Sequence, residues 1–456
     1  MNSKDLTQRI NAPESEPLFA SLYGKTGVAE ARKRYSALIE GLAELKVADN
    51  ADLRVFTAAG RTELGGNHTD HNRGKVLAAS IQLDSVAIVS KRDDKVVFFR
   101  SAAYPDVELD ISDLSAHPAE QGTTEALIRG IAADFARQGV QVGGFTVNAN
   151  PTVLPGSGLS SSAAVEVLFC KIFDKLYGKG KLTALEIAQI GQKAENEYFG
   201  KPCGLMDQCA CAFGGAIAID FADPAKPLVK QIDFDFETLG YALCVVNTRG
   251  SHADLTADYA AIPEEMKAIA RHFGKDVLRE VDGRLLTSYA AELRAKLGDR
   301  AVLRALHFYN ENERVEDMRM LLEEVAKRLT QLSPDLEPPA SESILAETRA
   351  AIEQRYFELV RRSGASSWEL LQNVYAPKNP REQGVSLALA LTQGFFDQKK
   401  IRGACRVHGG GFAGTIQVYI PLEALEAYRQ SMEAVFGVGA LTVLRIRPVG
   451  VAELVF

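Results

Sequence analysis

The chain has 456 residues, of which 46% are hydrophobic and 24% are charged, and its formal net charge is −7. This acidic balance, without a run of Lys or Arg, argues against a nucleic-acid partner, and no apolar stretch approaches the roughly 20 residues that span a membrane. The N-terminus lacks the hydrophobic segment of a signal peptide, so we expect a cytoplasmic globular protein of two or three domains.

The elements follow in chain order. Residues 1–20 are polar and we expect them to form a loosely held arm, before a helix at 29–45 and a strand at 53–61. Strands at 86–90 and 96–100 alternate in polarity, and Arg92-Asp93-Asp94 between them predicts a hairpin turn. The other predicted elements are helices at 123–137, 182–198, 256–272, 282–297, 315–332, 341–361 and 422–436, and strands at 76–81, 145–148, 214–221, 241–247, 416–420 and 441–446.

A loop rich in Gly and Ser at 154–164 runs directly into a helical pattern that ends near Gly178. The first backbone N–H groups of a helix have no partner within it, and the aligned peptide dipoles favour a negative charge there. Glycines let the backbone approach a ligand closely, so the loop suits a phosphate group. The alternative is an ordinary loop with a good helix cap.

Polar and charged side chains gather among glycines at 60–72, between two predicted strands. His68, Asp70 and His71 could bind a metal ion, but the glycines oppose the helix that would bring both imidazoles together. Recognition of a polar substrate is the interpretation that we favour for this segment.

The helix that ends near Tyr198 is followed by a Gly/Pro break and then by Asp207, next to apolar Leu205 and Met206. A half-buried carboxylate must find a donor or a cation, or else serve as a helix N-cap; the local sequence leaves both open. A second glycine-rich turn lies at 409–414. The six cysteines have no metal-ligand spacing, and we expect buried free thiols.

Three of these elements, namely 60–72, 155–164 and 409–414, resemble the motifs of the GHMP superfamily of small-molecule kinases. The first is similar to the galactokinase signature Gly-Arg-x-Asn-x-x-Gly-Glu-His-Thr-Asp-Tyr, and the segment 202–208 matches galactokinases closely. His252, Leu255 and Tyr259 repeat another spacing of that family. The chain departs from these patterns at four positions, which are Glu63, Asn67, His71 and Ala413.

The resemblance implies an α+β fold of two lobes, with mixed and antiparallel sheets and an active site in the cleft between them. We expect an N-terminal arm at 1–20, an N-terminal lobe at 21–222 and a C-terminal lobe at 223–456. The implied activity is ATP- and Mg²⁺-dependent phosphorylation of the anomeric hydroxyl of galactose by a monomer or small homo-oligomer. The alternatives are a kinase for a modified hexose, such as galacturonate or an N-acetylated amino sugar, and a non-catalytic sugar sensor.

The resemblance also implies a role for individual residues. Asp207 would accept the proton of the sugar hydroxyl, with Arg61 beside it, and Ser162 and Glu195 would hold Mg²⁺. The sugar would be bound by Asn67, His68, Asp70, Gly204 and Tyr259. The ATP phosphates would be enclosed by Pro155, Gly156, Ser157, Gly158, Leu159, Ser160 and Ser161, with Gly410 and Gly411 closing over the reacting centre.

Overall fold

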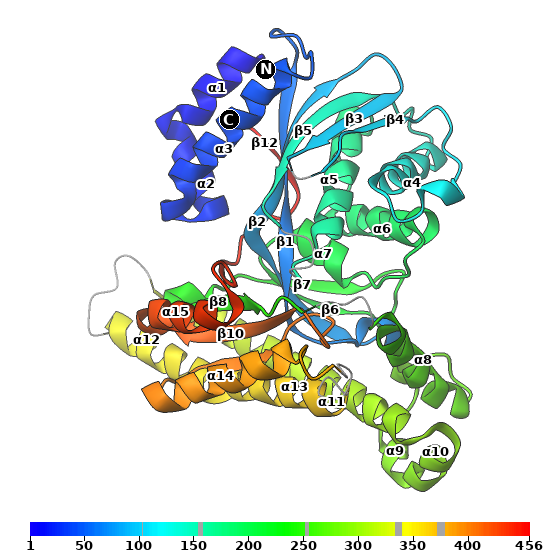
Figure 1. Ribbon diagram of the computed structural model, residues 1–456, viewed down its shortest axis with the longest axis vertical. Coiled ribbons are helices and arrows are strands. Elements are labelled where there is room, and N and C mark those ends of the chain that lie inside the picture. The colour runs from blue at the N-terminus through cyan, green and yellow to red at the C-terminus, as the bar shows by residue number, and fades with distance from the viewer. Residues whose placement is uncertain (103, 154–157, 251–254, 333–339, 372–378) are drawn as a thin grey trace.

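The computed structural model describes residues 1–456 except 103, 154–157, 251–254, 333–339 and 372–378. The chain forms two lobes, each built on its own β-sheet (Figure 1). The predicted combination of helices with mixed and antiparallel sheets is confirmed. Among the described helices, none has both the length and the apolar character that crossing a membrane requires.

The first sheet has eight strands in the order β12-β1-β2-β5-β3-β4, with β6 paired to β2 and β7 paired to β6. In the described part of the chain β3 and β5 run parallel, and the other neighbours in this sheet run antiparallel. The strands are β1 (Leu53–Gly65), β2 (Lys75–Lys91), β3 (Val96–Ser101), β4 (Val107–Asp110), β5 (Phe145–Pro151), β6 (Ala216–Asp220), β7 (Leu228–Ile232) and β12 (Ala452–Leu454).

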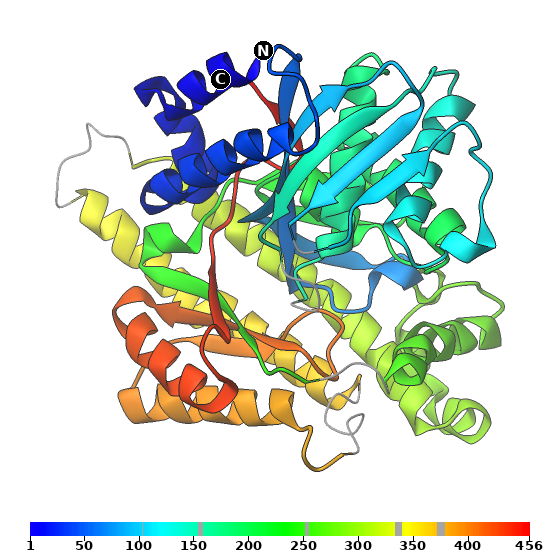
Figure 2. The ribbon, with the colours of Figure 1, turned by 45° about the horizontal axis from the view of Figure 1, so that its top comes forward.

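Both faces of this sheet are covered, because successive side chains of a strand point to opposite faces. On β1, Leu53 and Val55 pack against one group of helices, whereas Phe56 and Ala58 pack against the other. Figure 2 shows helices on both faces of this sheet. The first group is α1 (Ser3–Asn11), α2 (Glu16–Tyr23) and α3 (Val28–Glu40), and the second is α4 (Thr124–Arg137), α5 (Ser161–Leu176), α6 (Ala184–Ala194) and α7 (Met206–Phe213).

The predicted hairpin at Arg92-Asp93-Asp94 is wrong. The strands on either side of it, β2 and β3, do not pair, because β5 lies between them, antiparallel to β2 and parallel to β3. The sequence showed two neighbouring strands and a turn, but it gave no indication that β5, which lies further along the chain, would be inserted between them.

Residues 1–20 are not a loose arm. They form α1 and the start of α2, and Leu6, Ile10 and Phe19 are almost fully buried against α3 and the sheet. The chain ends in the same place: β12 pairs with β1, and the Arg9 guanidinium donates to the backbone carbonyl of Phe456 at 2.6 Å. Both termini therefore belong to the first lobe, where Figures 1 and 2 show them side by side.

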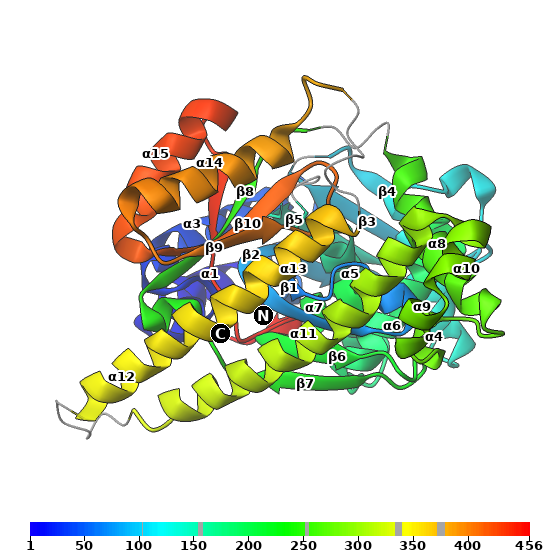
Figure 3. The ribbon, with the colours of Figure 1, turned by 90° about the horizontal axis from the view of Figure 1, so that it is seen from below.

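The second sheet is antiparallel, in the order β11-β8-β10-β9. Its strands are β8 (Tyr241–Asn247), β9 (Ala404–Val407), β10 (Thr415–Pro421) and β11 (Leu441–Leu444). One face packs on α14 (Gly384–Lys399) and α15 (Leu425–Phe436), and the other on α11 (Asp299–Leu329) and α13 (Phe357–Glu369) (Figure 3). The remaining helices are α8 (Thr256–His272), α9 (Arg284–Ser288), α10 (Ala290–Leu297) and α12 (Ala340–Ala351), with π-helical turns at Glu195–Phe199 and Ile352–Tyr356.

The expected lobe boundary at 222/223 falls inside the β6–β7 hairpin, whose two strands both belong to the first sheet. The second lobe is instead bounded on both sides by the first, because the last segment returns to it as β12. Asp223-Pro224 marks the turn of that hairpin, so the local turn signal was real, but it was not a domain boundary.

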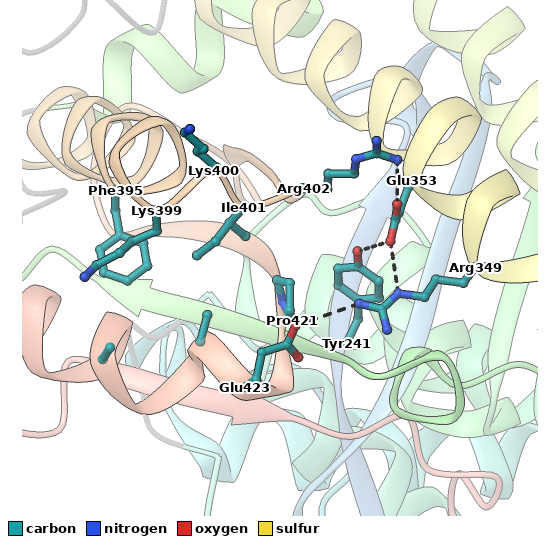
Figure 4. A pocket seen from close by; sticks show the side chains of 12 residues that line it. Tyr241, Arg349, Glu353, Phe395, Lys399, Lys400, Ile401, Arg402, Pro421 and Glu423 are labelled. Carbon is teal, nitrogen blue, oxygen red and sulfur yellow. Dashed lines mark hydrogen bonds and ion pairs between the residues drawn. The ribbon is translucent and has the colours of Figure 1, made fainter. Parts of the chain in front are cut away.

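A cavity of about 540 Å³ on the second lobe is lined by residues of α12, the π-helical turn that follows it, α14, α15, β8 and β10 (Figure 4). Its polar centre is Glu353, which accepts hydrogen bonds from the Tyr241 hydroxyl at 2.7 Å, Arg349 at 3.0 Å and Arg402 at 3.1 Å. The side chain of Glu353 is only 12% exposed. These contacts tie the helices to β8, and we interpret the cluster as structural.

Candidate functional site

Arg61 and Asp207 meet although 146 positions separate them in the chain. Arg61 stands on the buried part of β1, and Asp207 is in the first turn of α7. The guanidinium Nε and Nη2 donate to the two carboxylate oxygens at 2.7 and 2.8 Å, which is the bidentate geometry that makes Arg–carboxylate pairs strong and directional. Asp207 is therefore not the N-cap of its helix, and the alternative that the sequence left open is resolved.

Asp207 remains reachable, since its side chain is 35% exposed while that of Arg61 is 8% exposed. Burial raises the pKa of Asp207, but Arg61 and the Ser160 hydroxyl, which donates to Oδ2, outweigh it and hold the pKa below its ordinary value. The carboxylate is thus ionised at neutral pH and directed towards the side on which the glycine- and serine-rich loop lies.

The loop lies directly beside this pair. The Arg61 guanidinium donates to the backbone carbonyl of Gly158, and the Arg61 backbone N–H donates to the carbonyl of Leu159 at 3.1 Å. Ser160 adopts a left-handed backbone, with φ 57°, and its side chain does not cap α5. The predicted phosphate residues Pro155, Gly156 and Ser157 lie outside the described residues.

Ser161 and Ser162 form the first turn of α5, where no side-chain cap occupies the helix amides. Such an N-terminus attracts anions, because its N–H groups and the helix dipole point in the same direction. The helix N-terminus of the predicted phosphate site therefore lies next to Asp207.

Glu195 lies at the start of the first π-helical turn and is 4% exposed. One of its oxygens accepts from Lys201 at 3.2 Å and the other from Gln208 at 2.9 Å. Gln208 also donates to Glu166 at 2.9 Å. Glu166 is fully buried, and burial, together with the nearby charge of Glu195, raises its pKa well above the ordinary value.

Sequence reasoning missed Glu166 and Gln208. A signal was present for Glu166, because it follows Ser162 by four positions and so shares its face of α5. The buried Oε1 atoms of Glu166 and Gln208 have no hydrogen-bond partner among the described residues. A serine hydroxyl together with a carboxylate is a hard-oxygen donor set, which fits Mg²⁺ bound jointly with substrate phosphates.

Four of the predicted sugar-binding residues meet in two pairs, Asp70 with Gly204 and His68 with Tyr259. Asp70 and Gly204 are in such close contact that a Cβ on residue 204 would lie 1.7 Å from Asp70 Oδ2. His68 has a left-handed backbone, with φ 55°, and its ring lies 6.4 Å from that of Tyr259. His252, which the sequence associated with Tyr259, lies outside the described residues.

His68 and His71 are neutral and form a chain of hydrogen bonds. Burial lowers the pKa of both imidazoles, that of His71 to about 3. Because Nε2 of His68 faces the carbonyl of Gly410 at 2.9 Å, it must carry the proton, and Nδ1 then accepts from Nε2 of His71 at 3.4 Å. No cluster of three or more possible metal ligands is found in the part of the chain that the structure describes.

Asn67 occupies a different place from the one expected of a sugar ligand. Its side chain is 1% exposed, and the amide donates to the carbonyl of Gly409 and accepts from the Ser367 hydroxyl at 2.9 Å. It presents no free polar atom to a substrate, because the structure turns it towards the second lobe.

Comparison with known proteins shows which family of folds this chain has. The family model described as GHMP kinases N terminal domain matches residues 126–215, which contain α5 and Asp207. Lactococcus lactis galactokinase, solved in complex with galactose, has a TM-score of 0.73 at 23% identity, over 92% of this chain and 100% of that chain. Methanococcus jannaschii mevalonate kinase has a TM-score of 0.53 at 13% identity, over 87% and 99%. The chain has the fold of the GHMP small-molecule kinases.

A second family model and the curated relatives show which kinase family within this fold the chain belongs to. The model described as the galactokinase galactose-binding signature matches residues 46–91, around Arg61 and Asp70. The galactokinase of Streptomyces coelicolor is 31% identical over 400 residues, which cover 86% of this chain and 91% of that protein. That of Actinobacillus pleuropneumoniae is 34% identical over 263 residues, covering 57% and 66%. The chain belongs to the galactokinase family, and it is a sugar kinase.

Proposed function

We propose that this protein transfers the γ-phosphoryl group of ATP to the anomeric hydroxyl of galactose, giving galactose 1-phosphate and ADP. The observation that carries the proposal is the bidentate Arg61–Asp207 pair beside the loop that precedes α5. Phosphoryl transfer requires positioning and neutralisation of charge more than covalent chemistry from the protein. A fixed carboxylate and a guanidinium provide both at one place.

In the proposed reaction Asp207 accepts the proton of the anomeric hydroxyl while that oxygen forms its bond to the γ-phosphorus and the bond to the ADP oxygen breaks. Arg61 keeps Asp207 ionised and offsets negative charge near the transferred group. The amides around Gly158, Leu159, Ser160 and Ser161 would bind the phosphates. Pro155, Gly156 and Ser157 belong to the same proposed site.

Ser162 and Glu195 would hold Mg²⁺, which would neutralise charge on the β- and γ-phosphates when bound. The buried Gln208 keeps Glu195 in place through its 2.9 Å hydrogen bond. Asp70, His68, Gly204 and Tyr259 form the proposed sugar subsite, and Gly410 and Gly411 would close over the reacting centre.

The test is a substrate panel with coupled detection of ADP, using galactose, galacturonate, N-acetylgalactosamine and glucose, with the position of the phosphate assigned by ³¹P NMR. We expect turnover of galactose with an anomeric phosphate as product. Turnover of galacturonate or the amino sugar without turnover of galactose would show that the substrate is a modified hexose and not galactose. Sugar binding without ADP release from any member would indicate a sensor.

Binding of galactose should strengthen as the pH rises through about 6. Burial raises the pKa of Asp70 to about 6, an effect that His68 opposes and the charge of Asp207 reinforces. Above this pH the ionised carboxylate accepts hydrogen bonds from sugar hydroxyls with both oxygens, so KM for galactose should fall across that range. Steady-state kinetics at pH 5 to 8 measure this, and the Asp70→Asn variant should lose the dependence; an unchanged profile in that variant would assign the titration to another group.

Gly204→Ala should strongly weaken sugar binding, because the new Cβ would lie 1.7 Å from Asp70 Oδ2 and would displace that carboxylate. We expect KM for galactose to rise by about 100-fold or more, since a small misplacement of a positioning group has effects of this size. Gly394→Ala is the matched control: it lies in α14 with no atom within 4 Å of the added Cβ, so it should keep full activity. Normal kinetics in Gly204→Ala would contradict the proposed position of Asp70.

A further inference from the structure

Asn67 departs from the family motif quoted above, and the structure shows what it does instead of facing a substrate. Its amide nitrogen contacts three oxygens: it donates to the carbonyl of Gly409 and lies 3.4 Å from each carboxylate oxygen of Glu63. Its amide oxygen accepts from Ser367. The Asn67 side chain thus links Glu63 on β1 to two parts of the second lobe, namely the glycine-rich turn and α13.

Glu63 is the second departure from the same motif, and it touches the first. It is 2% exposed and forms an ion pair with Arg406, which is fully buried on β9 and also donates to the carbonyl of Leu64 at 2.8 Å. A buried ion pair is costly unless its geometry is good and the remaining polar atoms are satisfied. The motif has Asn and then Glu at positions 63 and 67, and this chain has Glu and then Asn. Compared with the motif, the carboxylate of this chain therefore stands four positions earlier, where Arg406 neutralises it.

Three successive carbonyls of the turn are held by side chains from the sugar side. Gly409 accepts from Asn67, Gly410 from His68 at 2.9 Å, and Gly411 from the Tyr259 hydroxyl at 2.5 Å. In a trans peptide the N–H points away from the carbonyl of the same unit. The amides of Gly410 and Gly411 therefore point away from the sugar segment.

The turn also borders the phosphate loop. A Cβ on Gly158 would lie 3.4 Å from His408, the residue before the turn, and a Cβ on Gly409 would lie 4.0 Å from the carbonyl of Gly158. Among the described residues the amides of Gly410 and Gly411 have no acceptor. The turn is thus held by its carbonyls on the sugar side, and it contacts the loop that is proposed to bind phosphate.

We propose that Asn67 is a positioning residue that, supported by the Glu63–Arg406 pair, holds the 409–411 turn so that the sugar subsite and the phosphate subsite are coupled. This proposal rests on the function proposed above. In this proposal Asn67 does not contact galactose; it fixes the turn whose amides point away from the sugar segment and would donate to the transferred phosphoryl group. Changes at Asn67 therefore affect the chemical step and the coupling between the two substrates, and they leave the intrinsic affinity for the sugar unchanged.

The test is Asn67→Asp, which keeps the shape of the side chain and replaces its donor with an acceptor that faces the Gly409 carbonyl and the Glu63 carboxylate. We expect kcat to fall by about 10- to 100-fold, as for other displacements of positioning groups, while KM for galactose in the presence of ATP rises only by about fivefold, the factor that the lost coupling between the substrates accounts for. A rise in KM for galactose of more than tenfold with unchanged kcat would show that Asn67 contacts the sugar, and unchanged kinetics would show that it does not hold the turn. Either result overturns the proposal.

The matched control is Asn312→Asp on α11, where the oxygen accepts from the Lys75 backbone N–H at 2.6 Å and the nitrogen donates to the carbonyl of Phe308 at 3.0 Å. It should retain wild-type kinetics, because Asn312 has no contact with the turn among the described residues. If Asn67→Asp fails to fold, Ser367→Ala removes one support of Asn67 without adding charge. This variant should lower kcat with a rise in KM for galactose of less than about tenfold, and a larger rise in KM with unchanged kcat counts against the proposal.

Binding measurements separate this inference from the proposed function. Calorimetry with a non-hydrolysable ATP analogue and Mg²⁺, with and without galactose, gives the factor by which the sugar tightens nucleotide binding. For the wild type we expect about fivefold or more, the lower end of typical coupling between sites, and for Asn67→Asp a factor near one. Equal coupling in both proteins would overturn the inference. Absence of galactose turnover by the wild type would instead refute the proposed function.

Discussion

Asp207→Asn is expected to lower kcat for galactose by about 10²- to 10⁴-fold, the range that a general base contributes, with little change in KM. The amide keeps the shape of the carboxylate, so Ser160 and Arg61 retain a hydrogen-bonding neighbour, but the residue can no longer accept the proton of the sugar hydroxyl. The measurement is steady-state kinetics with the coupled ADP assay.

Two controls make this result interpretable. Asp235→Asn changes a half-buried carboxylate in the second lobe, which accepts the backbone N–H of Glu237 at 3.1 Å, and it should leave kcat unchanged. Thermal unfolding of Asp207→Asn should show a folded protein, so that lost activity cannot come from lost structure. An Asp207→Asn variant that turns over galactose at the wild-type rate would rule out the proposed mechanism.

The pH dependence distinguishes the two carboxylates of the site. Arg61 and Ser160 hold the pKa of Asp207 below its ordinary value despite burial, whereas burial raises the pKa of Asp70 to about 6. An acidic limb near pH 6 in kcat/KM should therefore disappear in Asp70→Asn. Asp207 contributes no limb in the neutral range, because it is already ionised there.

Asp84→Asn is expected to destabilise the fold by about 3–5 kcal/mol, the usual cost of breaking a buried ion pair. Asp84 and Arg447 are both fully buried and 2.7 Å apart, and Arg34 contacts the other carboxylate oxygen at 2.7 Å. The Tyr23 and Thr57 hydroxyls also donate to Asp84, at 2.6 and 2.7 Å. The carboxylate thus joins α2, α3, β1 and the C-terminal segment, and the variant leaves two cations without a counter-charge.

Denaturant unfolding measures this loss, and Asp94→Asn is the control. Asp94 pairs with Arg92 at 2.6 Å, but both side chains are exposed, and such pairs contribute about 0–1 kcal/mol. A loss below about 1 kcal/mol in Asp84→Asn would mean that the network contributes no more than a surface pair.

The same network has a predictable dependence on pH. Burial opposes the charge of Asp84, but Arg34 and Arg447 lower its pKa below the ordinary value of a free aspartate. Its contribution to the free energy of unfolding is therefore fully present above the unfolded pKa, about 4, and is lost as the pH falls through the lower folded pKa. Asp84→Asn should show a weaker decline in stability with acid than the wild type.

Much of the local structure could be predicted from periodicity. The helix expected at 256–272 coincides with α8, and the loop that runs into a helix at 154–164 is followed by α5 from Ser161 to Leu176. Apolar spacing records which face of an element is buried, so it predicts the element well. It does not record which other element covers that face, and the false hairpin between β2 and β3 follows from this limit.

The polar arm at 1–20 was misjudged for a related reason. Only a few apolar residues of this segment, among them Leu6 and Ile10, are buried. So few apolar residues in a polar segment do not predict a buried helix unless the elements that cover them are known. The segment is stabilised by α3 and by the C-terminal strand β12, which comes from the opposite end of the chain. No window of sequence contains both.

By itself, the sequence determined the chemistry that is present: a carboxylate at Asp207, a guanidinium at Arg61, serines before a helix and glycines at two turns, in an order that resembles one family. Only the tertiary structure decided which of these groups meet. It brought Asp207 to Arg61, turned Asn67 away from the proposed sugar subsite towards Gly409, and placed Glu166 behind Glu195. The physical reason is that hydrogen bonds and ion pairs act over a few ångströms of space, whereas sequence patterns report only on neighbours along the chain.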